Sequence, residues 1–578
     1  MIKTLAKSIR EYKKDSIITP VLIAGEVVME CLLPFVMAKL IDGMEEGGMP
    51  FILKYGALLI ALAMLSLMFG ALAGITAATA SCGFAKNLRK DLYYKVQDYA
   101  FADIDKFSTS SLVTRLTTDV ANVQNAYQMI IRGAIRTPLM LIFSITMSLM
   151  INVKMSLIFL GILPVLAAAL FGVFFVVHPI FKRIFKKYDA LNNSVQENVA
   201  GIRVVKSFVR EDYEKEKFGH ASEEVRKDFT MAEKIIALNN PAMMICVYAA
   251  MFLVNFLGAR MIVNSGATEL TTGELSSLMN YGVQILTAMM IFSMMFVMCA
   301  LASESASRIC EVIEHDPSLP LKENGLTEVK DGSIVFENVS FKYSERSKRD
   351  ALSNINLTIK SGSTVGIIGG TGSSKSSLIQ LIPRLYDATA GKVLVGGVDV
   401  RDYDVHALRD AVSVVLQKNV LFAGTVSENL RWGNKEASDE ELVRVSKLAQ
   451  ADEFVSTFAD GYEYRIEQGG TNVSGGQKQR LCIARALLKK PRIIILDDST
   501  SAVDTKTDAL IRKALKTEIP DTTKIIIAQR LASVEDADVI LVMDKGTIVE
   551  QGTHDELMSL GGIYREIYDS QTKAKEAS

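Results

Sequence analysis

The stretch Gly366-Ile-Ile-Gly-Gly-Thr-Gly-Ser-Ser-Lys-Ser-Ser-Leu378 decides the fold of the second half of the chain. An apolar β-branched run leads into a loop of small residues, and a Lys-Ser pair opens a helical pattern. Small residues let backbone N–H groups converge on phosphate oxygens at a helix N-terminus, so this stretch predicts a phosphate-binding loop. Lys375 would then contact the β- and γ-phosphates and Ser376 would hold Mg²⁺. The match is imperfect because Ser374 stands where the pattern demands Gly, and a Gly/Ser-rich turn is the alternative.

The residues around this loop predict an α/β domain with a largely parallel sheet. From Ile334 onward, short β-branched runs alternate with helical patterns, which is typical of strands joined by helices. One run ends directly before Asp497, a position suited to a carboxylate that contacts Mg²⁺ through a water bound to the ion. The predicted strands are Ser333–Glu337, Thr364–Ile368, Val412–Leu416, Ile493–Leu496, Lys524–Ile527 and Val539–Met543.

The first 310 residues have the opposite character. The whole chain has 578 residues, 64 Lys+Arg and 65 Asp+Glu, so its charge favours neither nucleic acid nor an anionic lipid surface as a partner. Hydrophobic residues make up 49% of it, which is too apolar for an ordinary soluble protein. A membrane-spanning helix needs about 20 apolar residues. Six segments qualify: Ser16–Ala38, Tyr55–Ala85, Thr137–Val153, Met155–Phe181, Ile235–Ala259 and Leu275–Ser303.

The charges between these segments predict their orientation, because Lys and Arg stay on the cytoplasmic side. Asp42–Leu53 and Ile262–Ser276 contain neither residue, whereas the N-terminus and the stretches 86–136 and 182–234 are rich in both. We therefore expect both termini in the cytoplasm. Helical periodicity continues through the two basic stretches, so we expect long cytoplasmic helices that turn at Asp105–Ser111 and around Glu211–Lys217.

A polar, proline-punctuated stretch follows the last apolar segment. We therefore expect a transmembrane domain at 1–314, a linker at 315–331 and a nucleotide-binding domain at 332–578. The predicted fold is multi-domain: a six-helix α transmembrane domain with long cytoplasmic extensions, followed by an α/β P-loop domain.

Five motifs in order make the chain resemble the ABC transporter ATPases over nearly its whole length. Val473-Ser474-Gly475-Gly476-Gln477, followed by Lys478-Gln479-Arg480, is similar to the family's signature motif and is the most specific of the five. Gln417 matches the Q-loop, Ser501-Ala502-Val503-Asp504 the D-loop, and Tyr343 the adenine-stacking aromatic residue. The resemblance implies ATP and Mg²⁺ as cofactors.

The resemblance also assigns site residues. It implies catalytic positions at Asp498, Gln529 and Gln417, and Mg²⁺ contacts from Ser376, Gln417 and Asp497. The residues expected at the nucleotide are Tyr343, Gly369, Gly370, Thr371, Gly372, Ser373, Ser374, Lys375, Ser376, Ser377, Ser474, Gly475, Gly476 and Gln477.

The resemblance further implies a head-to-tail pair of nucleotide domains, with each ATP between the phosphate loop of one and the signature motif of the other. One set of motifs makes this chain a half-transporter that needs a second chain. Six spans before one nucleotide domain resemble the exporter class. By that resemblance, Ser108–Arg115 and Arg210–Lys217 would be coupling helices that dock on nucleotide domains.

Three positions depart from the family pattern. Asp498 replaces the usual Glu that polarises the attacking water, Gln529 replaces the usual His, and Ser374 replaces Gly. All three belong to the chain's own ATP site, whereas the signature motif is intact. We therefore expect a heterodimer, similar to bacterial heterodimeric multidrug exporters, in which this site hydrolyses ATP poorly and the signature motif completes a competent site on a non-identical partner. A slow homodimer in which Asp498 still works is the alternative.

The expected function is ATP-driven export of hydrophobic or amphipathic compounds, including drugs. A lipid or peptide exporter, or an ATP-gated channel or sensor without net pumping, are the alternatives. Ionisable residues at membrane depth are functional candidates, and flexible Met side chains suit varied apolar ligands. The candidates for the substrate pathway are Glu26, Glu30, Met290 and Met294, with internal pairing of the glutamates and ordinary packing of the methionines as alternatives.

Overall fold

The computed structural model describes residues 1–319, 322, 324–344, 347–499 and 502–576. The chain forms two compact units, one of Met1–Gln97 and Ser108–His315 and the other of Asp98–Phe107 and Asp316–Ser578. The short segment Asp98–Phe107 therefore packs with the second unit, although the sequence predicted it inside the transmembrane domain.

The first unit is entirely helical. In its described residues, six helical stretches are long and apolar enough to cross a membrane: Ile2–Asp42, Gly47–Gln97, Thr109–Ile151, Val153–Phe181, Glu211–Ser265 and Thr272–Phe292. Each overlaps one of the six predicted spans, which confirms them. The elements are α1 (Ile2–Ala6), a 3₁₀ turn (Lys7–Tyr12), α2 (Lys13–Asp42), α3 (Met44–Gln97), α5 (Thr109–Thr114), a π-helical turn (Arg115–Asp119), α6 (Val120–Ile151), α7 (Val153–Ala200), α8 (Ile202–Ser207), α9 (Glu211–Ala237), α10 (Asn239–Ser265) and α11 (Thr272–Glu314).

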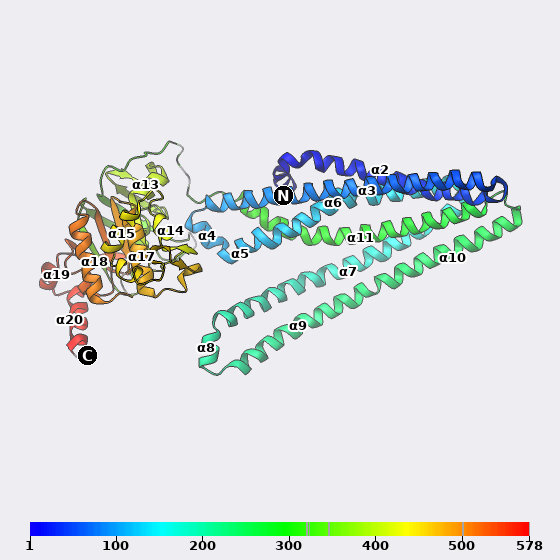
Figure 1. Cartoon of the computed structure of the whole chain (residues 1–578). Helices are drawn as coiled ribbons and strands as arrows, with labels where there is room; N and C mark the ends of the chain where they lie inside the picture. The colour runs from blue at the N-terminus through cyan, green and yellow to red at the C-terminus, as the bar shows by residue number, and fades with distance from the viewer. Residues whose placement is uncertain (320–321, 323, 345–346, 500–501, 577–578) are drawn as a thin grey trace. The chain divides into compact units, whose positions relative to one another are not determined.

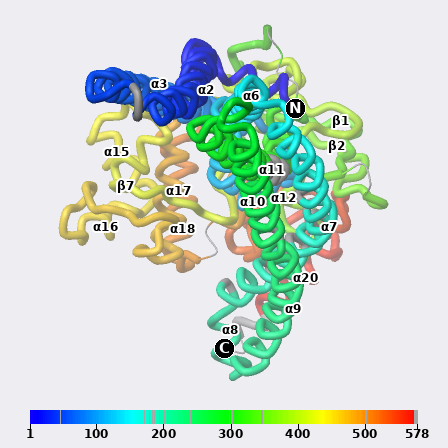
Figure 2. The backbone as a smooth tube through the Cα atoms, turned by 90° about the vertical axis from the view of Figure 1, so that its right-hand side faces the viewer, coloured from blue at the N-terminus to red at the C-terminus, as the bar shows by residue number. Residues whose placement is uncertain are grey.

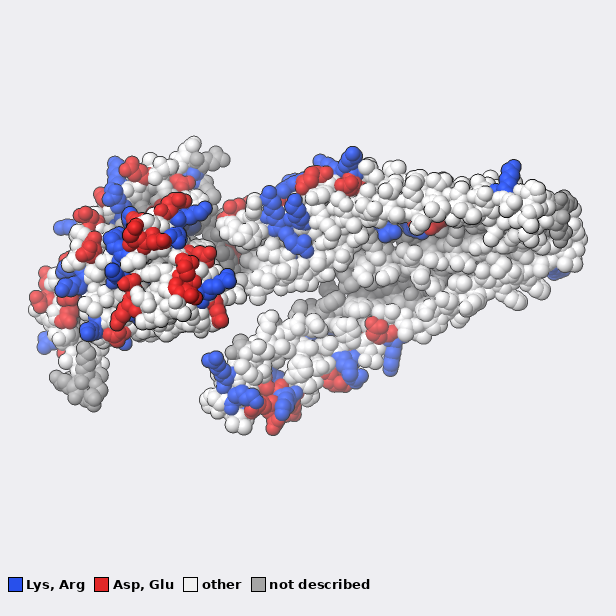
Figure 3. Space-filling model, viewed as in Figure 1, with Lys and Arg blue, Asp and Glu red and all other residues white. Residues whose placement is uncertain are grey.

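Within this unit, α7 and the α9–α10 pair run side by side down to a tip formed by α8, away from α2 and α3 (Figures 1 and 2). In Figure 3, Lys, Arg, Asp and Glu gather near this tip and near the N-terminus, while the surface toward the opposite end of the helices is almost free of charged side chains. This division fits an apolar membrane-spanning part with polar extensions.

The second turn at the ends of the long helices lies earlier in the chain than predicted, whereas the first lies within the predicted Asp105–Ser111. The second turn consists of α8 and the residues up to Arg210, and α9 already begins at Glu211, where the sequence predicted the break. The first turn falls between α4 (Phe101–Phe107) and α5, where Ser108 caps α5 with a φ of +56°. The helix continues through Glu211–Lys217 because the polar residues there keep a helical spacing. From the sequence alone, a polar stretch of helix is difficult to distinguish from a polar turn.

The second unit contains two main sheets. The strands are β1 (Ile334–Phe341), β2 (Leu352–Ile359), β3 (Thr364–Ile368), β4 (Ala390–Val395), β5 (Val398–Asp399), β6 (Val412–Val415), β7 (Gly424–Thr425), β8 (Arg465–Ile466), β9 (Ile493–Asp497), β10 (Thr523–Ile527), β11 (Val539–Asp544) and β12 (Thr547–Gly552). The larger sheet has the order β12-β11-β3-β10-β9-β6, and its strands are parallel except for β12. The smaller sheet, β2-β1-β4-β5, is antiparallel.

All six predicted β runs are strands, but the antiparallel sheet departs from the expectation of a largely parallel arrangement. All five residues of β9 and of β10 are buried, as is usual for parallel strands covered on both faces. The helices of this unit are α4, α12 (Lys375–Gln380), α13 (Val405–Ala411), α14 (Val426–Arg431), α15 (Asp439–Leu448), α16 (Asp452–Val455), α17 (Gly475–Leu488), α18 (Thr505–Glu518), α19 (His554–Leu560) and α20 (Ile563–Glu576).

Candidate functional site

The carboxyl ends of four neighbouring strands bring the predicted catalytic residues together. The parallel strands β3, β10, β9 and β6 end at one edge of the larger sheet. The phosphate loop follows β3, Gln529 follows β10, Asp497 ends β9, and Gln417 follows β6. Residues more than 150 positions apart in the chain thus meet because parallel strands present the same ends to one edge.

The phosphate loop joins β3 to α12 through two unusual backbone positions. Gly369 has a φ of +150°, and a Cβ atom there would lie 2.2 Å from the carbonyl oxygen of Met543, so only glycine fits. Ser374 has a φ of +71° and a ψ of +26° immediately before α12. A left-handed conformation costs a residue with a side chain about 1–2 kcal/mol. The structure therefore gives a physical reason for the Gly that the pattern requires at this position.

Lys375 folds back over the loop. Its Nζ donates hydrogen bonds to the carbonyl oxygens of Gly369 at 2.8 Å and Gly370 at 2.9 Å, and to Ser373 Oγ at 3.2 Å. Burial lowers the pKa of the Lys375 ammonium, whereas the charges of Asp497 and Asp498 oppose that shift. The ammonium is thus held at the loop by carbonyl groups, as a phosphate-contacting lysine would require.

The residues expected at Mg²⁺ fit a hard cation that prefers oxygen ligands. The Ser376 hydroxyl donates a hydrogen bond to the carboxylate of Asp497. Burial raises the pKa of this carboxyl, and the hydrogen bond from Ser376 lowers it. Asp497 is only 4% exposed, at the end of a fully buried strand. Ser376, Asp497 and Gln417 would hold the ion. When bound, Mg²⁺ stabilises negative charge on the phosphate oxygens.

Asp498 is held by two glutamine side chains. Gln529 Nε2 donates to Asp498 Oδ2 at 2.8 Å, and Gln417 Nε2 makes a long hydrogen bond of 3.5 Å to the same oxygen. The backbone N–H of Asp498 donates to the carbonyl oxygen of Ile527, and its φ is +48°. Burial raises the pKa of the Asp498 carboxyl, and the two amide hydrogen bonds oppose this rise. The structure thus brings all three predicted catalytic positions together.

The sequence did not identify a further residue at this site, Gln571 in α20. Its Nε2 donates to the carbonyl oxygen of Gln529 at 2.9 Å, and its Oε1 accepts from the N–H of Leu531 at 3.0 Å. The C-terminal helix therefore fixes the backbone on both sides of Arg530. No motif marks this contact, because it joins residues about 40 positions apart through a single amide side chain.

Tyr343 lies beside the first turn of α12. Its hydroxyl bonds Ser377 Oγ at 2.9 Å and Gln380 Oε1 at 3.1 Å, and 49% of the residue is exposed. Its ring meets that of Tyr386 edge-on, with 5.2 Å between the centroids. An exposed ring next to the helix that begins at the phosphate loop is in reach of a nucleotide base, as the resemblance implies.

The signature motif forms the N-terminus of α17. Ser474 and Gln477 make a reciprocal capping box, with Gln477 N to Ser474 Oγ at 3.3 Å and Ser474 N to Gln477 Oε1 at 2.8 Å. A Cβ atom at Gly476 would lie 2.8 Å from the carbonyl oxygen of Ala502, so the D-loop packs directly on this turn. The remaining D-loop residue of the prediction, Ser501, lies outside the described residues. Such an exposed helix N-terminus presents N–H groups that suit phosphate oxygens.

In the first cytoplasmic turn, α4 packs within the second unit. Asp105 Oδ2 accepts a hydrogen bond from the Tyr386 hydroxyl at 2.8 Å, and the rings of Phe101 and Tyr386 lie 6.2 Å apart. The backbone N–H of Ser318 donates to Asp103 at 3.0 Å. The Asp105 carboxylate and burial both raise the pKa of Tyr386.

The predicted substrate-pathway residues divide into two groups. Arg136 of α6 bonds both glutamates of α2: its Nη1 contacts Glu26, and its Nη2 contacts the two carboxylate oxygens of Glu30 at 2.8 and 2.9 Å. Arg136 and Glu30 line a cavity of about 720 Å³. Met290 and Met294, in contrast, are 41% and 56% exposed on the single chain and are not among the residues that line this cavity.

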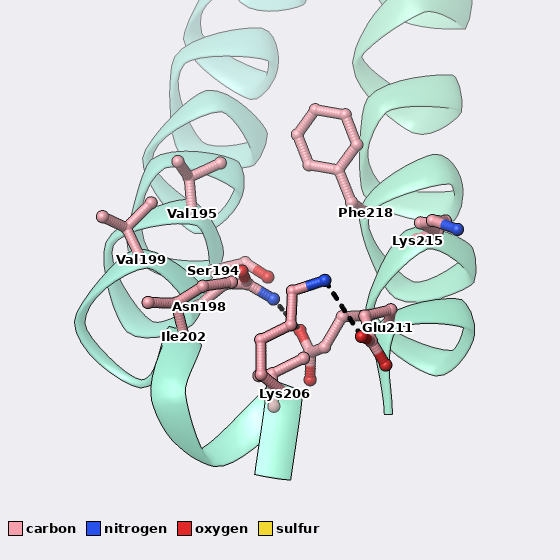
Figure 4. A pocket seen from close by; sticks show the side chains of 11 residues that line it. Ser194, Val195, Asn198, Val199, Ile202, Lys206, Glu211, Lys215 and Phe218 are labelled. Carbon is pink, nitrogen blue, oxygen red and sulfur yellow. Dashed lines mark hydrogen bonds and ion pairs between the residues drawn. The ribbon is translucent and has the colours of Figure 1, made fainter. Parts of the chain in front are cut away.

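A second hollow lies at the tip of α7, α8 and α9 and has a volume of about 350 Å³ (Figure 4). Figure 4 shows Val195, Val199 and Ile202 facing Phe218 across it, with the Lys206–Glu211 ion pair of 3.0 Å at its lower edge. Beside it, Phe208 and Val209 are 73% and 80% exposed. This tip is an apolar surface on a polar extension.

Comparison with known proteins places both units. Residues 16–301 match the family model for the ABC transporter transmembrane region, and residues 352–501 match that for the ABC transporter. The ATPase domain of that family uses ATP with Mg²⁺.

The chain is 36% identical over 552 residues to the "Uncharacterized ABC transporter ATP-binding protein YfiB" of Bacillus subtilis (strain 168), covering 95% of both chains. It is 32% identical over 579 residues to an ABC transporter ATP-binding protein of Mycobacterium tuberculosis, covering 99% of this chain and 98% of the relative. A solved structure of a bacterial Atm1-family ABC exporter with ATP bound has the same fold, with a TM-score of 0.81, 24% identity, and 97% and 98% of the two chains covered. The chain belongs to the ABC transporter family, with the fold of an exporter half-transporter.

Proposed function

We propose that this chain is one half of an ATP-driven exporter that moves hydrophobic or amphipathic compounds, drugs among them, out of the cytoplasm. Its partner is a second, non-identical half-transporter, and its own ATP site binds nucleotide but hydrolyses it poorly. The observation that carries the proposal is the arrangement around Asp498, whose Oδ2 accepts from both Gln529 and Gln417.

The chemistry at Asp498 supports slow hydrolysis at this site. Aspartate is one methylene shorter than the usual glutamate, and a misplacement of about 1 Å can slow a reaction about 100-fold. Gln529 can donate a hydrogen bond to the carboxylate, but an amide carries no positive charge for the γ-phosphate as a histidine can. The site is therefore suited to binding ATP more than to activating the water that attacks the γ-phosphate.

The signature motif and the tip of α8 support the proposal that this chain associates with a partner chain. The exposed turn at Ser474 and Gly475 leaves N–H groups for a nucleotide held by another chain. Phe208 and Val209 are exposed apolar residues that association with a partner would bury. Both features are intact on a chain whose own catalytic positions depart from the family, which favours a division of labour between two different chains.

The proposed location is the plasma membrane of a bacterial cell, as the bacterial relatives suggest, and the charge pattern supports both termini in the cytoplasm. The connections that begin at Asp42 and Ile262 carry neither Lys nor Arg, and basic residues mark the cytoplasmic side.

The test is the ATPase rate of the full-length chain in lipid, purified alone and as the complex that co-purifies from its own cells. We expect turnover below about 1 s⁻¹ for the chain alone, and faster turnover for the complex. In the complex, the double variant Asp498→Glu/Gln529→His should raise turnover, because two sites then hydrolyse ATP. The matched control is Asp521→Glu, which lengthens an exposed carboxylate elsewhere in the same unit. Turnover above about 1 s⁻¹ for the chain alone would favour the homodimer.

An ATP-gated channel or sensor is the second candidate, and the same observation at Asp498 favours it, since such a protein needs ATP binding more than hydrolysis. Uptake of an amphipathic dye into inverted membrane vesicles separates the two functions. Accumulation against a gradient that requires ATP hydrolysis indicates a pump. Equilibration that ATP binding alone permits indicates a gate.

A further inference from the structure

We propose that the 720 Å³ cavity between α2, α3, α6 and α11 binds a lipophilic monocation, whose charge is recognised by the surplus carboxylate of the Glu26–Glu30–Arg136 cluster. The inference rests on the proposed export function only in naming this cation as a transported compound; binding itself requires no ATP hydrolysis.

The cavity has the size and lining of a small-molecule site. Ligand pockets commonly measure about 300–1,000 Å³ and combine apolar walls with a few convergent polar groups. Here the polar groups are Glu30, Arg136, Thr137, Asn280, Gln284 and Thr287. The apolar walls include Leu33, Leu59, Ile60, Met140, Val283 and Ile291.

The charges of the cluster do not balance. Two carboxylates share one guanidinium, so the cluster has a formal charge of −1. Arg136 is fully engaged by Glu26 and Glu30, and both Glu30 oxygens lie within 2.9 Å of its Nη2. Glu26 Oε2 is buried and has no hydrogen-bond partner among the described residues. Two largely buried carboxylates with only one cation between them are costly in an apolar surrounding, and a bound monocation would offset the surplus charge.

The sign of the surplus charge selects the ligand. The side chains of Glu30 and Arg136 are 25% and 27% exposed, and both line the cavity, whereas Glu26 is 9% exposed behind them. An anion would meet a guanidinium already neutralised by two carboxylates. A monocation brings the cluster and ligand to zero net charge, and its apolar body can contact the aliphatic walls.

The site is also held in place by the backbone of α2. Pro34 has no N–H, so the carbonyl of Glu30 loses its usual partner in the helix. Gln284 Nε2 donates to that carbonyl at 3.4 Å, and the Tyr281 hydroxyl donates to the carbonyl of Cys31 at 2.6 Å. Gln284 is itself fixed by Ser144 at 2.9 Å. Because α11 completes the hydrogen bonding of α2 beside Pro34, Glu30 keeps its position when a ligand enters.

A close approach of α3 explains why Glu26 is buried. A Cβ atom at Gly70 would lie 3.0 Å from Glu26 Oε1. Glycine therefore lets α3 pack over the carboxylate, and Glu26 contributes its charge without facing the cavity directly. Glu30 is the group that a ligand can reach.

The experiment measures binding of radiolabelled tetraphenylphosphonium to the full chain, with its co-purified partner, in lipid nanodiscs; empty nanodiscs give the background. Neutral triphenylphosphine oxide, which resembles the probe without its charge, is measured as a competitor. We expect saturable binding of the cation, and Glu30→Gln should weaken it at least about tenfold while the neutral competitor is unaffected. Glu304→Gln removes an exposed carboxylate from α11 and should leave binding unchanged.

A second variant does not depend on the charged cluster. Ala63 is exposed and lines the cavity, so Ala63→Trp fills the space with little risk to folding. It should weaken binding of both the cation and the neutral competitor. Equal binding to protein and empty nanodiscs, equal binding by wild type and Glu30→Gln, or unchanged binding by Ala63→Trp would each overturn the inference.

Uptake by inverted vesicles distinguishes this inference from the export function. If Glu30-dependent binding of the cation is found without ATP-driven uptake, the binding site is correct and export fails. If ATP drives uptake of a neutral amphiphile while the cation does not bind, export stands and the cation site is wrong.

Discussion

Ser374 is a residue with a side chain at a left-handed position of the phosphate loop, where the pattern requires glycine. Its left-handed backbone closes the phosphate loop immediately before α12. Because the following Lys375 and Ser376 begin the helix, strain at Ser374 acts on the two side chains expected to contact phosphate and Mg²⁺. The loop nevertheless keeps its hydrogen bonds to Lys375.

The variant Ser374→Gly should stabilise the nucleotide-binding unit. Glycine removes the penalty of about 1–2 kcal/mol for a left-handed side-chain residue but adds about 0.4–1 kcal/mol of entropy to the unfolded chain. We expect a gain of up to about 1.6 kcal/mol, measured as a rise in the unfolding temperature. Gly372→Ala, at a φ of +82°, is the paired variant and should lower that temperature. A fall for Ser374→Gly would show that the loop is unstrained.

The buried carboxylate of Asp497 should make stability depend on pH in the absence of nucleotide. Burial raises its folded-state pKa above the unfolded value. The protonated folded form is then favoured, so its contribution to stability is present at low pH and is lost as pH rises through the folded-state pKa. Asp497→Asn cannot ionise, so it should unfold at a higher temperature than wild type at pH 8, and the difference should shrink toward pH 5. A difference that is constant with pH would contradict this assignment.

At the scale of elements, α20 acts as a brace for the segment that carries Gln529. Gln571 spans the carbonyl of Gln529 and the N–H of Leu531. The helix is amphipathic and belongs to the end of the chain, a place where order requires specific contacts. Gln529 in turn holds Asp498, so α20 is linked to the Asp498 carboxylate through one intermediate residue.

The variant Gln571→Ala should loosen this segment. Loss of two hydrogen bonds of about 0.5–1.5 kcal/mol each should speed amide hydrogen exchange at residues 529–531, while α17 remains protected. Thr572→Ala, at the neighbouring exposed position, should leave the exchange unchanged. Unchanged exchange in Gln571→Ala would mean that α20 has no bracing role.

The contacts of α20 belong to the features that could not be predicted from the sequence. The spans, the parallel strands and the phosphate loop have local signals: apolar runs, β-branched runs and small residues before a Lys-Ser pair. The antiparallel sheet, the Gln571 contacts and the packing of α4 depend on which distant segments meet. The same holds for Arg136, whose partners Glu26 and Glu30 lie about 110 positions earlier in the chain. Internal pairing of the two glutamates was an alternative from the sequence, but nothing in it identified the guanidinium that contacts both.

At the scale of the whole molecule, the proposed partner should bind through the tip of α8. Phe208 and Val209 expose apolar surface there, and Val209 has a φ of +52°, a strained value for a β-branched residue. Burial of an exposed aromatic side chain contributes about 1.5–3 kcal/mol. Phe208→Asp should therefore reduce the amount of partner that co-purifies.

The control for this prediction is a substitution on the same helical extension. Lys227→Asp changes an exposed charge of α9 away from the tip and should not affect co-purification. If both variants or neither reduce the recovered partner, the tip of α8 is not a specific contact.

The packing of α4 with the second unit has a consequence for the order of synthesis. Residues Asp98–Phe107 leave the ribosome more than 200 residues before the strands and loops that they join. Asp105 and Phe101 meet Tyr386 only after most of the membrane helices have been made. The nucleotide-binding unit is therefore discontinuous in sequence, and a fragment that starts at residue 316 would leave Tyr386 without this neighbour. The nucleotide-binding unit can therefore complete its folding only after the first unit has been translated, although α4 has been synthesised long before.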